Sequence, residues 1–289
     1  VLEGIEYVPT LAVRASEMTG LERLFGVTKD RMTPCFLLAP WASSKLLSRT
    51  ISRIERAFPN RLYFLDLDRD YQSTSDVNGA QREYAELLDP TGAYSNWIEF
   101  VAQHEHVIPC IQTGGLSEAD IRRQMREVRS MGRTYCFRIQ IEPSLPPNLD
   151  QIIGAINAEG AADFVIILEA GWVSDALSLA PRFSGLLRGP LAAINPVVPV
   201  VCSCTSIPRM FTDFNDSRPV AVPFTNRALI EQVGRQSNRE RVIYGDWGST
   251  RPREPGGFAS RPLDRIDYPT DAAWYIARNR DDEWDFRDA

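Results

Sequence analysis

Lysine and histidine are scarce in this sequence, and each shortage excludes a class of chemistry. Among 289 residues, lysine occurs only at Lys29 and Lys45, so arginine supplies nearly all of the positive charge. Lys29 precedes a predicted strand, so a Schiff base mechanism would rest on Lys45 alone. His104 and His106 also precede a predicted strand. We therefore expect no histidine base and no histidine-rich metal site at the carboxyl ends of the strands.

The cysteines are few, odd in number and never in C-x-x-C spacing. Each lies inside an apolar run, which favours reduced thiols in the protein core over disulfides or zinc ligands. The five residues are Cys35, Cys110, Cys136, Cys202 and Cys204.

The chain also lacks an excess of positive charge and any long apolar run. Its formal net charge is -6, so we expect no basic surface for duplex nucleic acid. No apolar stretch approaches the roughly 18 residues of a membrane helix, and no signal peptide pattern precedes the first predicted strand. We expect a cytoplasmic protein without membrane contact, and the sequence leaves its oligomeric state open.

Short apolar runs that alternate with helical patterns are the main feature that is present. Runs such as FVIIL, at residues 164–168, are typical of parallel strands that are buried on both faces. The predicted strands are residues 6–13, 33–40, 61–68, 107–113, 133–142, 162–171 and 197–205, with an eighth in the stretch 241–252. The predicted helices are residues 16–25, 44–58, 81–88, 94–103, 117–131, 149–158, 175–187, 226–236 and a closing helix 271–279.

This alternation predicts an α/β fold, a (β/α)8 barrel of the TIM type, in one domain that spans residues 1–289. Residues 248–289 would form an extended segment that packs on the barrel after the last strand. An open doubly wound sheet is the alternative. No G-x-G-x-x-G follows the first strand, so nothing supports dinucleotide binding.

Polar residues gather where the predicted strands end, which is where barrel enzymes hold their active sites. Four carboxylates are the catalytic candidates: Asp66, Asp68, Glu169 and Asp246. We expect substrate contacts from Arg138, Gln140, Ser206, Tyr244 and Trp247. Because strand side chains alternate, Asp66 and Asp68 share one face, as do Arg138 and Gln140.

Three interpretations of this group remain open. A divalent cation, magnesium or calcium, could be held by Asp66, Asp68 and Asp246 and act on a phosphate-bearing substrate. A pair of carboxylates could instead serve as acid and base without a metal. The third is a salt-bridge network around Arg138 that only closes the barrel mouth. An acidic run at 213–216 is either a cation site or a polar loop.

Several short motifs resemble the bacteriophage beta protein family, which occurs in phages, prophages and bacterial genomes. They are YVPTLAVRASEMTGLERL at the start, LDLD at 65–68, CTSIP at 204–208, and YGDWGSTRP, RIDYP and WYIARNR near the end. The chain departs from the family pattern at Ser16, at Glu169 and at Asn279. The matching positions are Glu17, Asp66, Asp68, Ser206, Pro208, Tyr244, Gly245, Asp246, Tyr268 and Trp274.

The resemblance implies a barrel-like fold and a phage or mobile-element setting, but it implies no particular reaction. Our first hypothesis is a hydrolase that acts at the barrel mouth on a phosphorylated small molecule or nucleotide, with a divalent cation. The second is a non-catalytic scaffold in phage–host conflict or phage assembly. In that case the long segments 69–90 and 207–223 would bind a phage or host protein.

Overall fold

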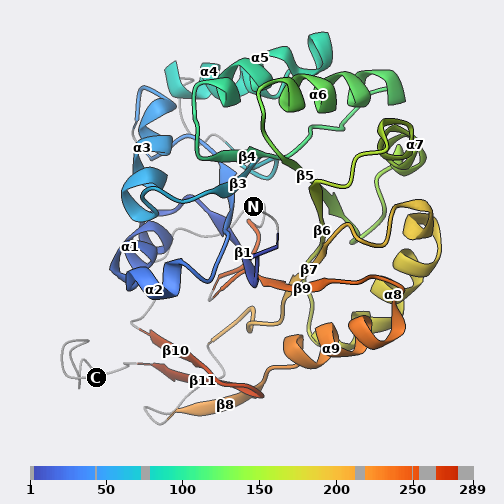
Figure 1. Cartoon of the computed structure of the whole chain (residues 1–289). Coiled ribbons are helices and arrows are strands. Elements are labelled where there is room, and N and C mark those ends of the chain that lie inside the picture. The colour runs from blue at the N-terminus through green and yellow to red at the C-terminus, as the bar shows by residue number, and fades with distance from the viewer. Residues whose placement is uncertain are drawn as a thin grey trace.

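Eight parallel strands form the centre of the molecule, with helices around them (Figure 1). The computed structural model describes residues 3–42, 44–72, 79–211, 219–248, 250–253 and 265–278. The barrel strands are β1 (Tyr7–Ala12), β2 (Cys35–Leu38), β3 (Tyr63–Leu67), β4 (Val107–Pro109), β5 (Tyr135–Gln140), β6 (Phe164–Trp172), β7 (Val200–Thr205) and β9 (Val242–Asp246).

The sheet closes on itself. Its hydrogen-bonded order is β4-β3-β2-β1-β9-β7-β6-β5, and every neighbouring pair is parallel. An isolated parallel bridge between Cys110 and Cys136 joins the two ends of this order. At the same seam the Ile111 amide donates to the Cys136 carbonyl oxygen at 2.8 Å. The prediction of a (β/α)8 barrel is therefore confirmed, and the predicted strands differ from the observed ones only at their ends.

Helices connect successive strands and cover the outside of the barrel (Figure 1). In α3, for example, Ile51, Ile54 and Ala57 share one face and are buried against the sheet. None of the described helices is long and apolar enough to cross a membrane. The helices are α1 (Ala15–Arg23), α2 (Gly26–Lys29), α3 (Ser48–Ala57), α4 (Gly79–Leu87), α5 (Thr91–Ala102), α6 (Glu118–Ser130), α7 (Leu149–Glu159), α8 (Ala180–Arg188) and α9 (Asn226–Gln236), with 3-10 turns η1 (Ala176–Leu179) and η2 (Pro190–Ala193).

The alternation of side chains along the strands divides the core into two parts. One set points into the barrel and fills it with apolar side chains, among them Val8, Phe64 and Val201. The other set packs beneath the surrounding helices. Trp247 continues the inward-facing set beyond β9 and is only 2% exposed.

The prediction of a closing helix at 271–279 is wrong. Residues Ala273–Arg278 form strand β11, which pairs with β10 (Arg265–Pro269) and β8 (Val220–Pro223) in an antiparallel sheet. Along β11, Trp274 and Ile276 are buried while Tyr275 is exposed, a period of two that belongs to a strand. Burial of these side chains against Phe224, with Tyr244 of β9 packed beside them, fixes the strand conformation.

This small sheet stands in the sector where the last helix of a (β/α)8 barrel would lie. In the described residues, no helix follows β9 before the chain reaches β10. Figure 1 shows β8, β10 and β11 on the side of the barrel between α2 and α9, next to β1 and β9. In the described part of the chain, the outer face of β1 and β9 is therefore bordered by this sheet on one side and by α9, which also packs against β9, on the other.

Gly245 is required where β9 lies close to its neighbouring strands β1 and β7 in the barrel wall. A Cβ atom at this position would lie 2.7 Å from Val201 Cγ1 and 3.1 Å from both Ser203 Cβ and the Val8 carbonyl oxygen. We predict that Gly245→Ala lowers the free energy of unfolding by about 2 kcal/mol or more in urea denaturation, because the strands must separate.

The matched control is Gly20→Ala in α1, where an added Cβ meets no atom within 4 Å. This exposed helical substitution should leave the free energy of unfolding unchanged or raise it by up to about 1 kcal/mol. Equal effects of the two substitutions on the free energy of unfolding would show that the barrel can accommodate a Cβ atom at position 245 without separating its strands.

Candidate functional site

The polar side chains of the barrel mouth come from several strands and point into the barrel. Asp66 of β3, Arg138 of β5 and Glu169 of β6 each lie two residues after an apolar side chain that points into the barrel. Their side chains therefore point into the barrel as well. All three therefore form the uppermost layer of the interior. The sequence-based prediction that these strand ends converge is confirmed for this group.

Asp66 and Arg138 form a buried ion pair. Arg138 Nη1 lies 3.2 Å from Asp66 Oδ2, and the two side chains are 8% and 11% exposed. Asp66 Oδ1 also accepts hydrogen bonds from Gln112 Nε2 at 2.7 Å and from the Leu67 amide at 2.8 Å. Burial alone would lower the pKa of Arg138, but the charges of Asp66 and Glu169 outweigh it and raise that pKa. The guanidinium thus stays charged inside the barrel.

Glu169 is a buried carboxylate with donors on both oxygens. Oε1 accepts from Trp247 Nε1 at 2.9 Å and from the Gly171 amide at 2.7 Å. Oε2 accepts from Ser203 Oγ at 2.9 Å and from Thr10 Oγ1 at 3.3 Å. Because a carboxylate has about four acceptor directions, these bonds leave little capacity for a metal or a substrate. The arrangement favours a positioning role, and the catalytic role of Glu169 stays a prediction.

Asp68 differs from Glu169 because one basic side chain holds it. Arg253 Nε lies 2.5 Å from Asp68 Oδ2, and Asp68 is 2% exposed. Burial raises the pKa of Asp68, although the hydrogen bond and the charge of Arg253 oppose the effect. Removal of Arg253 from this carboxylate would therefore leave a buried group that readily takes up a proton.

The segment after β9 crosses the mouth. Trp247 is buried in the barrel and donates to Glu169, and Arg253 reaches Asp68 at the end of β3. Between them, Pro252 lies over Gly171, where an added Cβ would be 3.6 Å from Pro252 Cγ. This crossing segment, residues 247–253 without the undescribed Ser249, ties β9 to β3 and β6.

A cleft of about 490 Å³ remains open at the mouth beside the crossing segment. Its wall includes Arg138 and Arg253, together with Arg209, whose Cζ lies 3.9 Å from the centre of the Trp172 ring. Gln140 is exposed at the end of β5 and also borders this cleft. Acidic residues contribute as well: Asp70, Glu142 and Glu169. Arg182 pairs with Glu142 at 2.7 Å, so that acid is neutralised.

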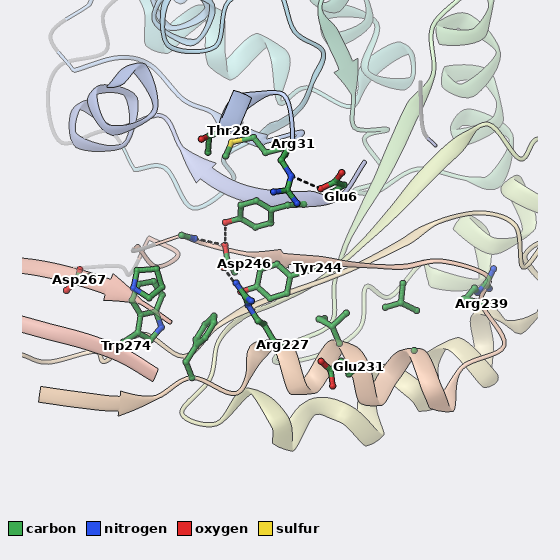
Figure 2. Close-up of a pocket in the computed structure, with 18 of the residues that line it drawn as sticks. Glu6, Thr28, Arg31, Arg227, Glu231, Arg239, Tyr244, Asp246, Asp267 and Trp274 are labelled. Carbon is green, nitrogen blue, oxygen red and sulfur yellow. Dashed lines mark hydrogen bonds and ion pairs between the residues drawn. The ribbon is translucent and has the colours of Figure 1, made fainter. Parts of the chain in front are cut away.

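Asp246 does not join this group, which corrects the predicted set of four carboxylates. Gly245 and Trp247 face the barrel interior, so Asp246 between them points to the outside, as does Tyr244. Asp246 accepts hydrogen bonds from Tyr7 Oη and Tyr244 Oη, each at 2.6 Å, and from the Gly248 amide at 2.8 Å. These residues border a second cleft outside the barrel (Figure 2).

The predicted metal site of Asp66, Asp68 and Asp246 is likewise not assembled. Within the described residues, no group of three or more histidine, cysteine, aspartate or glutamate side chains is placed to hold a metal ion. Asp66 and Asp68 remain on the mouth side, and the acidic run 213–216 lies outside the described residues. Ser206 follows the end of β7 but does not line the mouth cleft, and its hydroxyl donates to Asn226 Oδ1 at the start of α9, at 3.0 Å.

Three residues that sequence reasoning did not single out as site residues contribute to these arrangements: Tyr7, Thr10 and Arg253. Tyr7 and Thr10 lie on opposite faces of β1. The alternation of side chains along this strand does not predict that they bond to Asp246 and Glu169, which are remote in sequence. Arg253 lies in a Gly- and Pro-rich stretch without periodicity. The motif STRP was the available signal, since it belongs to the family-like segment at 244–252 that leads to this arginine.

Glu17 at the start of α1 is linked to the crossing segment. Thr250 Oγ1 donates to Glu17 Oε1 at 2.9 Å, while Oε2 is buried and has no hydrogen-bond partner in the described part of the chain. Burial raises the pKa of Glu17 from 4.5 to about 7, against the opposing charges of Arg14 and Arg253.

This shift predicts a pH dependence of stability. Because the folded-state pKa exceeds the unfolded value, protonated Glu17 favours folding below about pH 4.5, and that contribution is lost as pH rises through 7. At pH 8, we expect Glu17→Gln to be more stable than the wild type by on the order of 1 kcal/mol, after discounting for partial exposure. The difference should vanish at pH 4.

Urea denaturation at pH 4, 6 and 8 measures this difference. The control is Glu22→Gln on the same helix, where the exposed Glu22 pairs with Arg56 at 2.8 Å. That variant should follow the wild type at all three pH values. A Glu17→Gln variant that parallels the wild type across this range would contradict the assignment.

The model of the family described as Beta protein matches residues 7–289 of the chain. Protein beta of Enterobacteria phage P4 is 24% identical over 280 residues, which cover 96% of this chain and 76% of that protein. Among solved structures, a crystal structure of D-psicose 3-epimerase in the presence of D-fructose has a TM-score of 0.37 and 8% identity, with 84% of each chain covered. A TM-score this low carries no functional argument. The match to the family model covers nearly the whole sequence, and the chain therefore belongs to the Beta protein family.

Proposed function

We propose that the barrel mouth binds a small molecule that carries a phosphate group. The observation that carries the proposal is Arg138, whose side chain is 8% exposed and whose Nε has no hydrogen-bond partner in the described part of the chain. A buried, unpartnered N–H costs about 1 to 3 kcal/mol, and an oxygen of a ligand would relieve that cost. Arg138 borders the 490 Å³ cleft, where Arg253 and Arg209 supply further guanidinium groups.

The proposed reaction is hydrolysis of a phosphate ester, with Asp68 as general base. A phosphate in the cleft competes with Asp68 for Arg253, because both anions suit a guanidinium. Asp68 released from this pair would sit buried with a raised pKa, which makes it a stronger base than an exposed aspartate. It would take a proton from the attacking water as the water oxygen bonds to phosphorus and the bond from phosphorus to the leaving oxygen breaks, and solvent in the open cleft would supply the proton that the leaving oxygen takes up. Sugar phosphates and nucleotides are the substrate classes that we propose.

Binding is tested by thermal unfolding with inorganic phosphate, ribose 5-phosphate and adenosine monophosphate. At a ligand concentration about 100-fold above Kd, we expect the wild type to gain about 2.7 kcal/mol. Arg253→Gln should weaken the affinity at least tenfold, because it removes a charged contact. Arg56→Gln, at an exposed surface pair, is the control and should bind as the wild type does. No stabilisation by any of the three phosphates would reject the proposal.

A role for magnesium or calcium in this reaction is a separate prediction. If Asp68 is a ligand, the stabilisation of the wild type by the cation should disappear in Asp68→Asn and persist in Asp246→Asn. The reason is that Asp246 faces the outside of the barrel. Thermal unfolding with and without each cation measures this stabilisation in each variant. Loss of the stabilisation in Asp246→Asn as well as in Asp68→Asn would contradict the prediction that Asp68, and not Asp246, binds the cation.

A second candidate function is a scaffold that binds a phage or host protein. The observation that favours it is the exposure of three apolar side chains where α1 meets α2: Leu24 (40%), Phe25 (80%) and Val27 (73%). Adjacent exposed apolar residues of this size are common at protein interfaces. The segments 69–90 and 207–223 that the sequence suggests for this role lie partly outside the described residues. If the protein neither binds phosphate at the barrel mouth nor hydrolyses phosphate esters, this alternative is favoured.

A further inference from the structure

The second cleft, outside the barrel, has no part in the proposed hydrolysis. It has a volume of about 1270 Å³ and lies between α2, α9, the outer face of β1 and β9, and the small sheet. This is the sector that a last barrel helix would fill. Figure 2 shows Asp246 and Tyr244 at the centre of this cleft, with Arg31 and Glu6 on one side and Arg227 and Glu231 on the other.

Three oxygen-bearing groups meet at the floor of the cleft. Tyr7 and Tyr244 each donate their only hydroxyl proton to Asp246, at 2.6 Å. The lone pairs of both phenol oxygens therefore remain available as acceptors. Their rings are also close, with centroids 5.5 Å apart. Burial, and then the charge of Asp246, raises the pKa of both tyrosines and keeps them protonated, although the charge of Arg227 opposes the rise at Tyr244.

Asp246 lacks a cationic partner within the described part of the chain. It is 7% exposed, and within the described residues its hydrogen bonds come from two phenols and one backbone amide. The cleft contains three arginines, and each of them is engaged elsewhere. Arg31 pairs with Glu6 at 3.0 Å, Arg227 pairs with Asp271, and Arg239 donates to backbone carbonyls. A buried carboxylate without a counter-ion favours a cationic ligand.

The remaining lining supports the same ligand chemistry. Five acidic residues line the cleft: Glu6, Glu231, Glu240, Asp246 and Asp267. Three of them pair with arginines, Glu6 with Arg31, Glu231 with Arg235 and Asp267 with Arg265, so Asp246 is the buried carboxylate that the described arginines leave unpaired. Phe224 and Trp274 add an aromatic wall, with ring centroids 5.3 Å apart. The indole N–H of Trp274 is buried and has no partner among the described residues.

The geometry points to a site for an alkylammonium group on this outer face. An ammonium has three donors, which match the carboxylate of Asp246 and the phenol oxygens of Tyr7 and Tyr244. The aromatic rings nearby favour a cation in the same place. Two sources carry this chemistry: a free amine such as a polyamine, and a lysine side chain of another protein.

Isothermal titration calorimetry at low ionic strength tests the inference with spermidine, a heptalysine peptide and the uncharged 1-butanol as probes. We expect one amine probe or both to bind with one-to-one stoichiometry and 1-butanol not to bind. Tyr7→Phe and Tyr244→Phe should each weaken binding about fivefold, because each removes one acceptor and keeps the ring. Tyr268→Phe is the matched control, a 65% exposed tyrosine of the small sheet, and should bind as the wild type does.

Tighter binding of spermidine would assign the site to a free amine, and tighter binding of heptalysine would assign it to a lysine of a partner protein. Asp246→Asn should weaken binding at least tenfold. If that variant fails to fold, the two phenol variants decide the question. Absence of binding by both amine probes overturns the inference. So does multi-site binding, or binding to which Tyr7 and Tyr244 contribute no more than Tyr268.

Discussion

Buried negative charge in the top layer of the barrel is the constraint on which the rest of the structure depends. Asp66, Asp68 and Glu169 are all nearly removed from solvent, and each requires donors from elsewhere in the chain. Arg138 satisfies the first and Arg253 the second, while neutral hydroxyl, indole and amide groups satisfy Glu169. These bonds connect β1, β3, β5, β6 and β7 with the segment that follows β9.

The same interactions explain the path of the chain after the barrel closes. Trp247 enters the interior because its ring completes the apolar core and its N–H meets Glu169. Arg253 then crosses to Asp68, so the segment lies over the mouth and not against the outer face of β9. In the described residues no helix follows β9, and α2, α9 and the small sheet border an open cleft there.

The two clefts differ in chemistry because opposite faces of β9 serve them. The inner face supplies Trp247 to a mouth with three guanidinium groups, of which Arg138 has an unpartnered N–H. The outer face supplies Tyr244 and Asp246 to a cleft in which acids exceed arginines. A phosphate suits the first environment and an ammonium suits the second. Because neighbouring side chains of a strand point to opposite faces, Asp246 and the following Trp247 border different clefts.

The sequence by itself determined the barrel, its eight parallel strands and the convergence of Asp66, Arg138 and Glu169. Apolar runs and strand periodicity are local properties, and the carboxyl ends of parallel strands must meet at one face. Tertiary structure alone decided the pairing of Arg253 with Asp68, 185 positions apart, and the outward direction of Asp246. It also decided that residues Ala273–Arg278 form a strand, since the pairing partners come from β8 and β10. Such contacts depend on residues remote in sequence, whose proximity no local pattern encodes.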